Sequence, residues 1–380
     1  MRNYLIIMRR EFYYMWQDRV LRYVLIIGPV LAILFFSYLY SFQNVTDIPS
    51  AVVDLDHSAQ SRELIRQLSN AENLKIENYP ETYKELESLI DQGIAAVGIV
   101  IPENYGQDIM SGKQTRILGI IDGSNMIYAT NASSTLIQVT GMISAETGIK
   151  TMVGMGMNLQ EATEAYQAIE FKEEAWYNPT LNYAYFLILA LALNMWQQCC
   201  VMAAAVNIIG ETGVKSWPQV KASGFSKWKF FLPKSLMHLI IFMALVLPIY
   251  YIGFVLVKLP LCCSFGSLMG FTLVFALAIH SMGTMMSSLT NNAVDSTRFG
   301  MIVALPSFIL CGYTWPLESM PAVISKAAWI LPQTWFFQGF NHMTFKGAEF
   351  HAMKGYYLGL LIITVVCYAV SMMATARSER

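Results

Sequence analysis

Charged side chains are scarce in this sequence. Asp, Glu, Lys and Arg make up 13% of the 380 residues and hydrophobic side chains 55%, whereas soluble domains carry roughly 25% charged residues. This shortage excludes an ordinary cytosolic enzyme. The charges are also uneven, because residues 41–180 hold eight Lys/Arg and nineteen Asp/Glu, and the remainder holds seventeen and seven. We infer an acidic, water-soluble block inserted into a basic, membrane-embedded frame.

Cysteine is absent from the acidic block. The six cysteines all lie in or beside hydrophobic stretches, and they are Cys199, Cys200, Cys262, Cys263, Cys311 and Cys367. No disulfide framework is implied. Adjacent cysteines on a helix point about 100° apart, and neither pair has a His or carboxylate at ligand spacing, so apolar packing is favoured over a metal site.

A nucleotide-binding motif is missing as well. The segment 106–114 (GQDIMSGKQ) resembles a phosphate loop, but that motif requires G-x-x-x-x-G-K-[ST]. Here the spacing is one residue too long, and Gln114 stands where a hydroxyl is needed. Within the apolar stretches only His238 and His280 are ionisable groups of catalytic type, and neither has a carboxylate neighbour in the sequence. We predict no catalytic residue, cofactor, metal or nucleic-acid site in this chain.

Six long apolar stretches are present, each near the 20 residues that a helix needs to span a bilayer. The predicted spans are 23–43, 181–209, 233–257, 263–289, 297–315 and 355–376. The first is too long for the core of a cleaved signal peptide and no A-x-A site follows it. A seventh uncharged stretch, 327–345, contains Pro332, Gln333, Gln338 and Asn341 and is not counted. The predicted fold class is a polytopic α-helical membrane protein with six transmembrane helices.

Lys and Arg cluster in three segments around these spans. Five arginines precede the first span, five lysines lie between residues 210 and 234, and Arg377 and Arg380 follow the last span. Because positively charged loops stay in the cytoplasm, both termini and the loop 210–232 are predicted to be cytoplasmic. Residues 44–180 then face the outside of a cell (inner or plasma) membrane. Residues 1–22 have the composition of an amphipathic helix lying in the headgroup plane.

The acidic block has the pattern of a small α/β domain. Residues 51–54, 95–101 and 116–122 are short apolar runs of strand type, and helical patterns at 58–69 and 81–92 lie between them. This alternation predicts partly parallel strands. Helical patterns at 129–148 and 159–175 predict a stalk that returns the chain to the membrane. The acidic turn at Asp54 and Asp56 is interpreted as a helix N-cap region rather than a metal or hydrolase site.

Four features together resemble the ABC-2 type transporter permease family. They are R-R-E and Q-D-R before a span that holds Pro29, an insert that begins AVVDLDHSAQSRELIRQL, the loop ETGVKSWPQVKASGF after the second span, and LPSFILCGYTWPLESMPAVISKAAWILPQTWFFQGFNHMTFKG before the last span. The resemblance covers essentially the whole chain. It implies the membrane subunit of an ABC exporter, possessing re-entrant helices within 316–354 on the outer side.

The resemblance also implies partners and site residues. A separate ATPase subunit would bind ATP and magnesium, and a coupling helix at about 211–225 would fit a groove on it. The implied coupling residues are Arg10, Glu11, Glu211, Lys215, Trp217 and Lys221. A second permease copy or a similar permease would complete the pathway, and some family members work with a periplasmic adaptor protein. The candidate pathway-lining residues are Asn182, Tyr185, Asn194, Gln197, Phe308 and Tyr313.

The sequence leaves two questions open. Polar side chains such as Asn194 and Gln197 in the middle of a span are explained equally by helix packing and by a cavity. The substrate is also open, although an interior rich in Met and aromatic residues is compatible with hydrophobic drugs or lipid-like molecules. The alternative functions are a membrane-anchored binding or sensor protein, which needs only one or two spans, and an ion channel, for which Asp295 and Arg298 are the candidate charges.

Overall fold

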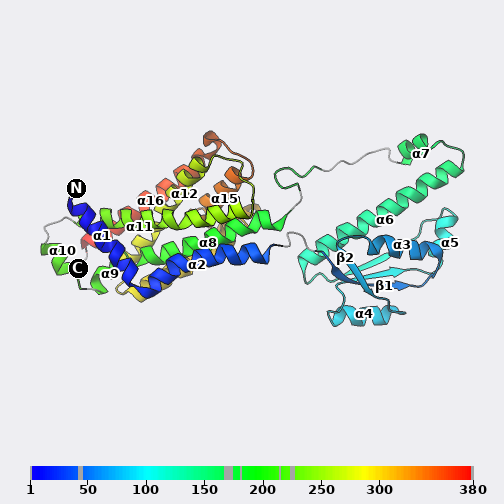
Figure 1. Ribbon diagram of the computed structural model, residues 1–380, viewed down its shortest axis with the longest axis horizontal. Coiled ribbons are helices and arrows are strands. Elements are labelled where there is room, and N and C mark those ends of the chain that lie inside the picture. Colours follow the sequence, from blue (N-terminus) through cyan, green and yellow to red (C-terminus); the bar gives the residue numbers. More distant parts are fainter. Residues whose placement is uncertain are drawn as a thin grey trace. The chain divides into compact units, whose positions relative to one another are not determined.

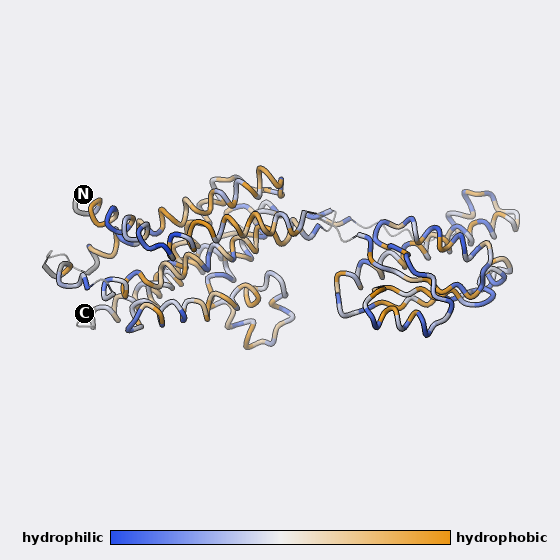
Figure 2. Tube along the Cα trace, turned by 60° about the horizontal axis from the view of Figure 1, so that its bottom comes forward, coloured by the Kyte–Doolittle hydropathy of each residue, from blue (hydrophilic) through white to orange (hydrophobic). Residues whose placement is uncertain are grey.

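Six helices in the described part of the chain are long and apolar enough to cross a membrane. The computed structural model describes residues 2–41, 46–166, 174–179, 182–213, 215–222 and 227–377. The six helices are α2 (Arg19–Leu39), α8 (Tyr183–Ala205), α11 (Lys227–Tyr250), α12 (Phe265–Leu289), α13 (Ala293–Leu310) and α16 (Phe350–Arg377), shown in Figure 1. Figure 2 shows that hydrophobic residues predominate along them. The chain is therefore a polytopic helical membrane protein.

Side-chain caps determine where several of these helices begin. Asp18, Asn182, Ser264 and Asn292 each accept a hydrogen bond from a backbone N–H in the first turn of the helix that follows, which satisfies donors that a helix start leaves unpaired. The Asn292 cap places the start of α13 at Ala293, before the predicted 297. The helix ends at Leu310 rather than 315, because Gly312 adopts a left-handed φ of 78°. α16 likewise begins at Phe350 and not at 355.

Helix α8 lies at the centre of the membrane unit, which comprises residues Met1–Ser41 and Ala175–Arg380. It packs against α2, α11, α12 and α13, and most of its side chains are buried. Trp196 is fully buried and donates a hydrogen bond from Nε1 to the carbonyl of Phe242, at 3.1 Å. Small residues let α12 approach α8 closely, since a Cβ on Gly283 would lie 2.5 Å from Cβ of Ala204. Such small-residue contacts are a usual means of helix association in membranes.

Shorter helices complete the membrane unit. They are α1 (Arg2–Gln17), α9 (Ile209–Gly213), α10 (Trp217–Ala222), the π-helix η1 (Tyr251–Leu256), the 3-10 helix η2 (Leu317–Ser319), α14 (Ala322–Ala328) and α15 (Pro332–Thr344). α15 is too short to span a bilayer, yet Phe336, Phe337 and Phe340 on it are buried in the core. Phe336 stacks on Phe275 of α12 with ring centroids 3.9 Å apart. The uncounted apolar stretch is thus a packed, non-spanning helix.

The second compact unit, Phe42–Glu174, is an α/β domain. Its sheet has the strand order β2-β1-β3-β4, with β1 (Ile48–Asp54) parallel to β2 (Leu74–Asn78) and β3 (Val97–Ile101), and β4 (Leu118–Ile121) antiparallel to β3. The helices are α3 (Ala59–Ser69), α4 (Tyr83–Asp91), α5 (Tyr105–Met110), α6 (Met126–Gly154) and α7 (Leu159–Tyr166). The predicted alternation is present, but β2 is an addition that the sequence pattern does not predict. Residues 167–173 of the predicted stalk lie outside the described part of the chain.

The acidic turn after β1 is a structural cap. Asp54 accepts hydrogen bonds from the backbone N–H groups of Asp56 and His57 and from the Ser61 hydroxyl, at 3.1, 3.0 and 2.7 Å. Asp56 accepts one from the N–H of Gly106, at 3.0 Å. These bonds join the end of β1 to the start of α3 and to α5, and the N-cap of α3 is Ser58, whose hydroxyl accepts a hydrogen bond from the N–H of Ser61 at 3.0 Å.

We predict that Gly283→Ala destabilises the membrane unit. The added methyl group would lie 2.9 Å from the carbonyl oxygen of Val201 as well as against Ala204, and overpacking of this kind costs roughly 1–3 kcal/mol. The midpoint of thermal unfolding in detergent should therefore fall. Gly270→Ala on the same helix is the matched control, because a methyl group added there would meet no atom within 4 Å beyond its own stretch of helix. Equal midpoints for the two variants would contradict the close contact between α8 and α12.

Candidate functional site

Helix α1 turns one narrow face toward the membrane unit and leaves the rest exposed. Ile7, Glu11 and Met15 are buried, and their spacing of four residues places them on one side of the helix. Many of the exposed side chains are hydrophobic, among them Leu5, Ile6, Phe12, Tyr13 and Trp16, while Arg9 and Gln17 are exposed polar residues. An acidic residue therefore occupies the middle of the protein-facing stripe.

Glu211 of α9 receives several charged and polar donors. Arg10 of α1 forms a bidentate contact with its carboxylate, at 3.2 and 2.8 Å, and the Ser216 hydroxyl also donates to it. Paired contacts between a guanidinium and a carboxylate are among the strongest side-chain hydrogen bonds. Glu211 is only 2% exposed, so this bond fastens α1 to the segment that follows α8.

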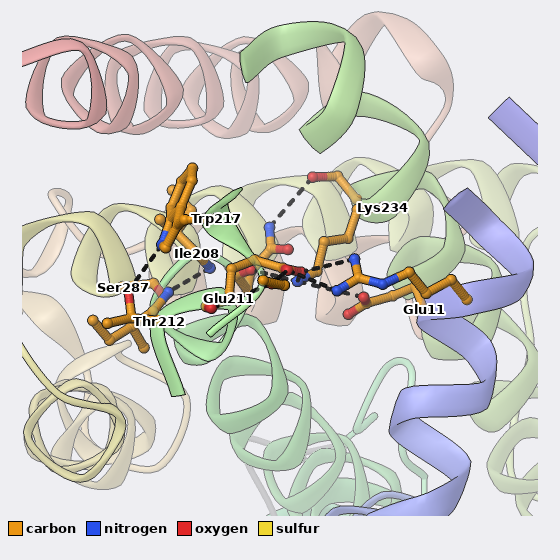
Figure 3. Close-up of polar contacts among 12 residues, drawn as sticks. Glu11, Ile208, Glu211, Thr212, Trp217, Lys234 and Ser287 are labelled. Carbon is orange, nitrogen blue, oxygen red and sulfur yellow. Dashed lines mark hydrogen bonds and ion pairs between the residues drawn. The ribbon is translucent and has the colours of Figure 1, made fainter. Parts of the chain in front are cut away.

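Lys234 of α11 joins the two carboxylates. Its Nζ lies 2.7 Å from Oε1 of Glu211, 3.4 Å from Oε2 of Glu11 and 2.7 Å from the carbonyl oxygen of Asn207. One turn further along α11, Nε2 of His238 lies 2.8 Å from Oε1 of Glu11. Figure 3 shows Glu11, Glu211 and Lys234 meeting where three segments of the chain come together. We call Arg10, Glu11, Glu211, Lys234 and His238 the ionic cluster.

The ionic cluster is balanced in charge, and all of its side chains except that of Arg10 are buried. Two carboxylates face one guanidinium and one ammonium group, so the sum is zero when His238 is neutral. Burial by itself raises the pKa of Glu211, but Lys234 and the hydrogen bonds from Arg10 outweigh burial and lower it from 4.5 to about 2. For Glu11 too, burial opposes ionisation, while Lys234 and His238 bring its pKa below the usual value. Both carboxylates are therefore ionised at neutral pH.

Further bonds hold the segment around α9 in place. The backbone N–H groups of Ile208 and Ile209 both donate to the Ser287 hydroxyl of α12, at 3.0 and 2.9 Å. Nε1 of Trp217 donates to the Thr212 hydroxyl at 3.0 Å. A small hydrophobic cluster packs beside these bonds and consists of Ile7, Ile208, Trp217, Val220 and Phe230. α1, α9, α10 and the start of α11 are thus joined by both polar and apolar contacts.

The predicted coupling residues divide into two groups. Arg10, Glu11 and Glu211 come together in the ionic cluster, with both carboxylates facing inward rather than toward solvent. Lys215 is exposed and Trp217 is buried. The side chain of Lys221 lies outside the described residues. The buried carboxylates hold the segments to one another, whereas Lys215 is accessible to a partner.

The predicted pathway residues lie around α8. Asn182 caps α8 and is buried, and Tyr185 is partly buried against the main core. Nε2 of Gln197 donates to Oδ1 of Asn194 at 3.1 Å and Nε2 of Gln333 to Oε1 of Gln197 at 2.9 Å. These bonds connect α8 to α15 and supply the packing explanation for polar residues in the middle of a span.

The other two candidates, Phe308 and Tyr313, join the same region. Tyr313 donates to the carbonyl of Phe186 at 2.6 Å and stacks on its ring with centroids 4.8 Å apart. Phe308 of α13 packs against Tyr313 at 5.9 Å between centroids. A pathway-lining role for these six residues stays a prediction.

Sequence reasoning misses Lys234 and His238 as site residues. It counts Lys234 only as a charge of the loop, and it gives His238 no carboxylate neighbour, which is wrong in space because Glu11 contacts it from 227 residues away. The available signal is their spacing of four, which puts two ionisable groups on one face of an otherwise apolar helix.

We predict that Lys234→Met is strongly destabilising. It leaves Glu11 and Glu211 buried without their shared cation, and breaking a buried ion pair costs roughly 3–5 kcal/mol. Thermal unfolding in detergent should show a much lower midpoint than for Lys326→Met, which removes an exposed lysine. Adding Glu11→Gln to Lys234→Met should restore part of the loss, since it removes one unpaired charge. A midpoint equal to that of the control would refute the pairing.

Acid should weaken the ionic cluster over a defined range. The pKa of Glu211 is lower in the folded chain than its usual value of 4.5, so its contribution to stability is complete above about pH 4.5 and is lost as the pH falls toward about 2. The difference in unfolding midpoint between the native chain and Glu211→Gln should therefore be constant near neutrality and shrink over that range. A difference that disappears already between pH 7 and pH 5 would show that Glu211 is not held ionised in this way.

Comparisons with known proteins place this geometry in a family. Residues 20–373 match the family model described as ABC-2 family transporter protein. The probable multidrug ABC transporter permease YbhR of Escherichia coli K12 is 22% identical over 358 residues, covering 94% of both chains. The inner membrane transport permease YhhJ of the same strain is 22% identical, covering 90% of this chain and 91% of its own. The linearmycin resistance permease protein LnrN of Bacillus subtilis 168 is 24% identical, covering 92% and 93%. With six membrane-spanning helices and a match along nearly its whole length, the chain belongs to the ABC-2 transporter family.

Proposed function

We propose that this permease works by transmitting the movement of a separate ATPase subunit through the ionic cluster. As a member of the family it is the membrane-spanning subunit of an ABC transporter. The single observation that carries the proposal is the contact of Lys234 with both Glu11 and Glu211. It ties α1 and the α9–α10 segment to a transmembrane helix at one end of the membrane unit.

The ionic cluster makes three segments move together. A push on α10 would reach Glu211 through Ser216, which directly precedes α10 and donates to that carboxylate. It would then pass to α11 through Lys234 and to α1 through Arg10. Because Glu11, Glu211 and Lys234 are buried, separating them would leave unpaired ions in a medium of low polarity, which is costly. The segments are therefore expected to shift as one body, and rigid-body movement of this kind converts binding into a change between two states.

The proposal places these segments and both termini on the cytoplasmic side, where ATP is available. Residues 210–234 carry several lysines and the N-terminal helix carries several arginines. Segments rich in Lys and Arg stay on the cytoplasmic side of a membrane. The α/β domain between α2 and α8 is then extracytoplasmic, and α14 and α15 form the re-entrant region. Residues 1–22 and 210–232 are the proposed interfacial helix and coupling loop.

A second copy or a similar permease is part of the proposal. One chain supplies half of a pathway in this family. The candidate lining residues come from α8 and its N-cap, from α13, and from the stretch between α13 and α15. The names of two relatives refer to multidrug transport or linearmycin resistance, which supports drug-like compounds as substrates, and the Met- and aromatic-rich interior suits hydrophobic ones. Nothing in the comparisons supports a periplasmic adaptor, and none is included. A sensor or channel function has no observation in its favour.

Co-purification tests the proposal directly. We expect the tagged chain, extracted in mild detergent from its native host, to carry an ATPase subunit with it. Lys215→Glu should reduce the amount of bound ATPase severalfold, because Lys215 is exposed close to Glu211 in the coupling segment. Lys326→Glu makes the same charge change on α14, at the proposed outer side, and should leave the amount unchanged.

The same preparation separates the parts of the proposal. If no ATPase accompanies the native chain, or if both lysine variants behave alike, coupling through this segment is wrong. In proteoliposomes that hold the complex, hydrophobic compounds should change the rate of ATP hydrolysis. A broad panel without effect, together with unchanged drug sensitivity of a deletion strain, would remove the substrate class but leave the permease assignment in place.

A further inference from the structure

A cavity of about 630 Å³ opens between α11, α12 and α16. Its volume falls within the range of roughly 300–1,000 Å³ in which proteins hold small organic molecules. Nine of the described lining residues are hydrophobic, among them Ile208, Leu236, Leu277 and Ala369, and the other six, among them Tyr368, carry a hydroxyl. Among the described residues, no Asp, Glu, Lys or Arg lines it. The cavity therefore suits a hydrocarbon and excludes a free ion.

The rim of the cavity is exposed on the surface of the membrane-spanning helices. Leu232, Leu236 and Val365 belong to membrane-spanning helices and are 63, 47 and 67% exposed. An exposed surface of this kind on a membrane span contacts lipid hydrocarbon rather than water. A molecule reaching the cavity thus comes sideways from the bilayer.

The cavity lies at the end of the bundle that carries the ionic cluster. Ile208 directly precedes α9, and Ser235, another lining residue, directly follows Lys234. The two long helices that flank this end bring positive charge with them. α11 begins with Lys227 and the exposed Lys229, and α16 ends at Arg377. In the sequence beyond α16, Arg380 and Glu379 cancel each other.

We infer that this cavity binds an acyl chain of an anionic phospholipid, whose phosphate lies near Lys229 and the end of α16. Two properties of the cavity and its surroundings support an anionic phospholipid as the occupant. The chain-sized cavity is open at its exposed rim, and the adjacent start of α11 and end of α16 carry Lys229 and Arg377. Basic residues beside a gap between membrane helices are a recurrent way of holding anionic headgroups.

This lipid site would act on the same parts that the proposed function uses. An acyl chain in the cavity contacts Ile208, and through it the α9 segment that is bonded to Ser287. It also lies against Tyr368, whose hydroxyl is 2.8 Å from Nδ1 of His280, and the ring of His280 lies 5.2 Å from that of His238. Bound lipid is thus positioned to stiffen the surroundings of the ionic cluster. The inference goes beyond the proposed function, and lipid binding itself does not depend on it.

Photo-crosslinking in nanodiscs tests the site without any ATPase. The probe is phosphatidylglycerol with a diazirine on one acyl chain, compared with phosphatidylcholine that carries the same group. We expect the anionic probe to label α11, α12 and α16 around the cavity severalfold more than the neutral probe, as mapped by mass spectrometry of peptides. Lys229→Gln should remove most of this preference.

Filling the cavity supplies the second measurement. Leu236→Trp and Ala369→Phe add bulk from two different helices and should each reduce labelling around the cavity severalfold. Leu247→Trp is the matched control, since Leu247 is exposed on the same helix as Leu236 and does not line the cavity. Unfolding midpoints establish that the variants are folded, and either filled variant suffices for the comparison.

Three results would overturn the inference. They are equal labelling by the two probes, labelling unchanged in both filled variants, and displacement of the probe by uncharged hydrophobic compounds but not by unlabelled phosphatidylglycerol. The last result would assign the cavity to transported compounds. Because the assay contains no ATPase, none of these outcomes bears on the permease assignment, and a failed ATPase co-purification would leave the lipid site untouched.

Discussion

The membrane unit depends on one unusual constraint, which is that two carboxylates are buried where their segments meet. Burying an isolated carboxylate is prohibitively expensive, so Glu11 and Glu211 can stay ionised only while Lys234 and Arg10 are beside them. The cations come from different helices, and the positions of α1, α9 and α11 are therefore mutually dependent. A hydrophobic contact in the same place would tolerate sliding, because dispersion forces have little direction. Charged groups with fixed hydrogen-bond geometry do not tolerate it.

Local sequence pattern is sufficient for the architecture because each membrane helix carries its own signal. A run of about 20 apolar residues determines a span whatever it packs against, and the six spans follow from that rule alone. The exact ends of the helices are harder to predict from the sequence. The cap at Asn292 and the left-handed Gly312 shift α13 by several residues, and neither effect changes hydrophobicity. In the α/β domain, β2 (LKIEN) alternates charged and apolar side chains, and this pattern is weaker than that of the buried β1 and β3.

Only half of the candidate site can be predicted from the sequence, for a different reason. Arg10, Glu11 and Glu211 stand out because their segments resemble those of a known family, and resemblance gives positions without contacts. In the structure both carboxylates turn inward and contact Lys234, and Glu11 also contacts His238. These contacts depend on three helices whose residues are up to 227 positions apart in the sequence. No local sequence pattern predicts contacts between residues so far apart. The spacing of Lys234 and His238 on an apolar helix signals that ionisable groups face the same way, but it does not identify the partner.

The balance of charge in the ionic cluster has an electrical consequence. A single charge that crosses a membrane potential exchanges about 2.3 kcal/mol with the field for each 100 mV. When His238 is neutral, the charges of Arg10 and Lys234 cancel those of Glu211 and Glu11, so a displacement of the whole group carries no net charge through the field. The energised membrane then neither drives nor opposes this displacement. If the proposed coupling operates, a collapse of the membrane potential would leave the force passed through the ionic cluster unchanged.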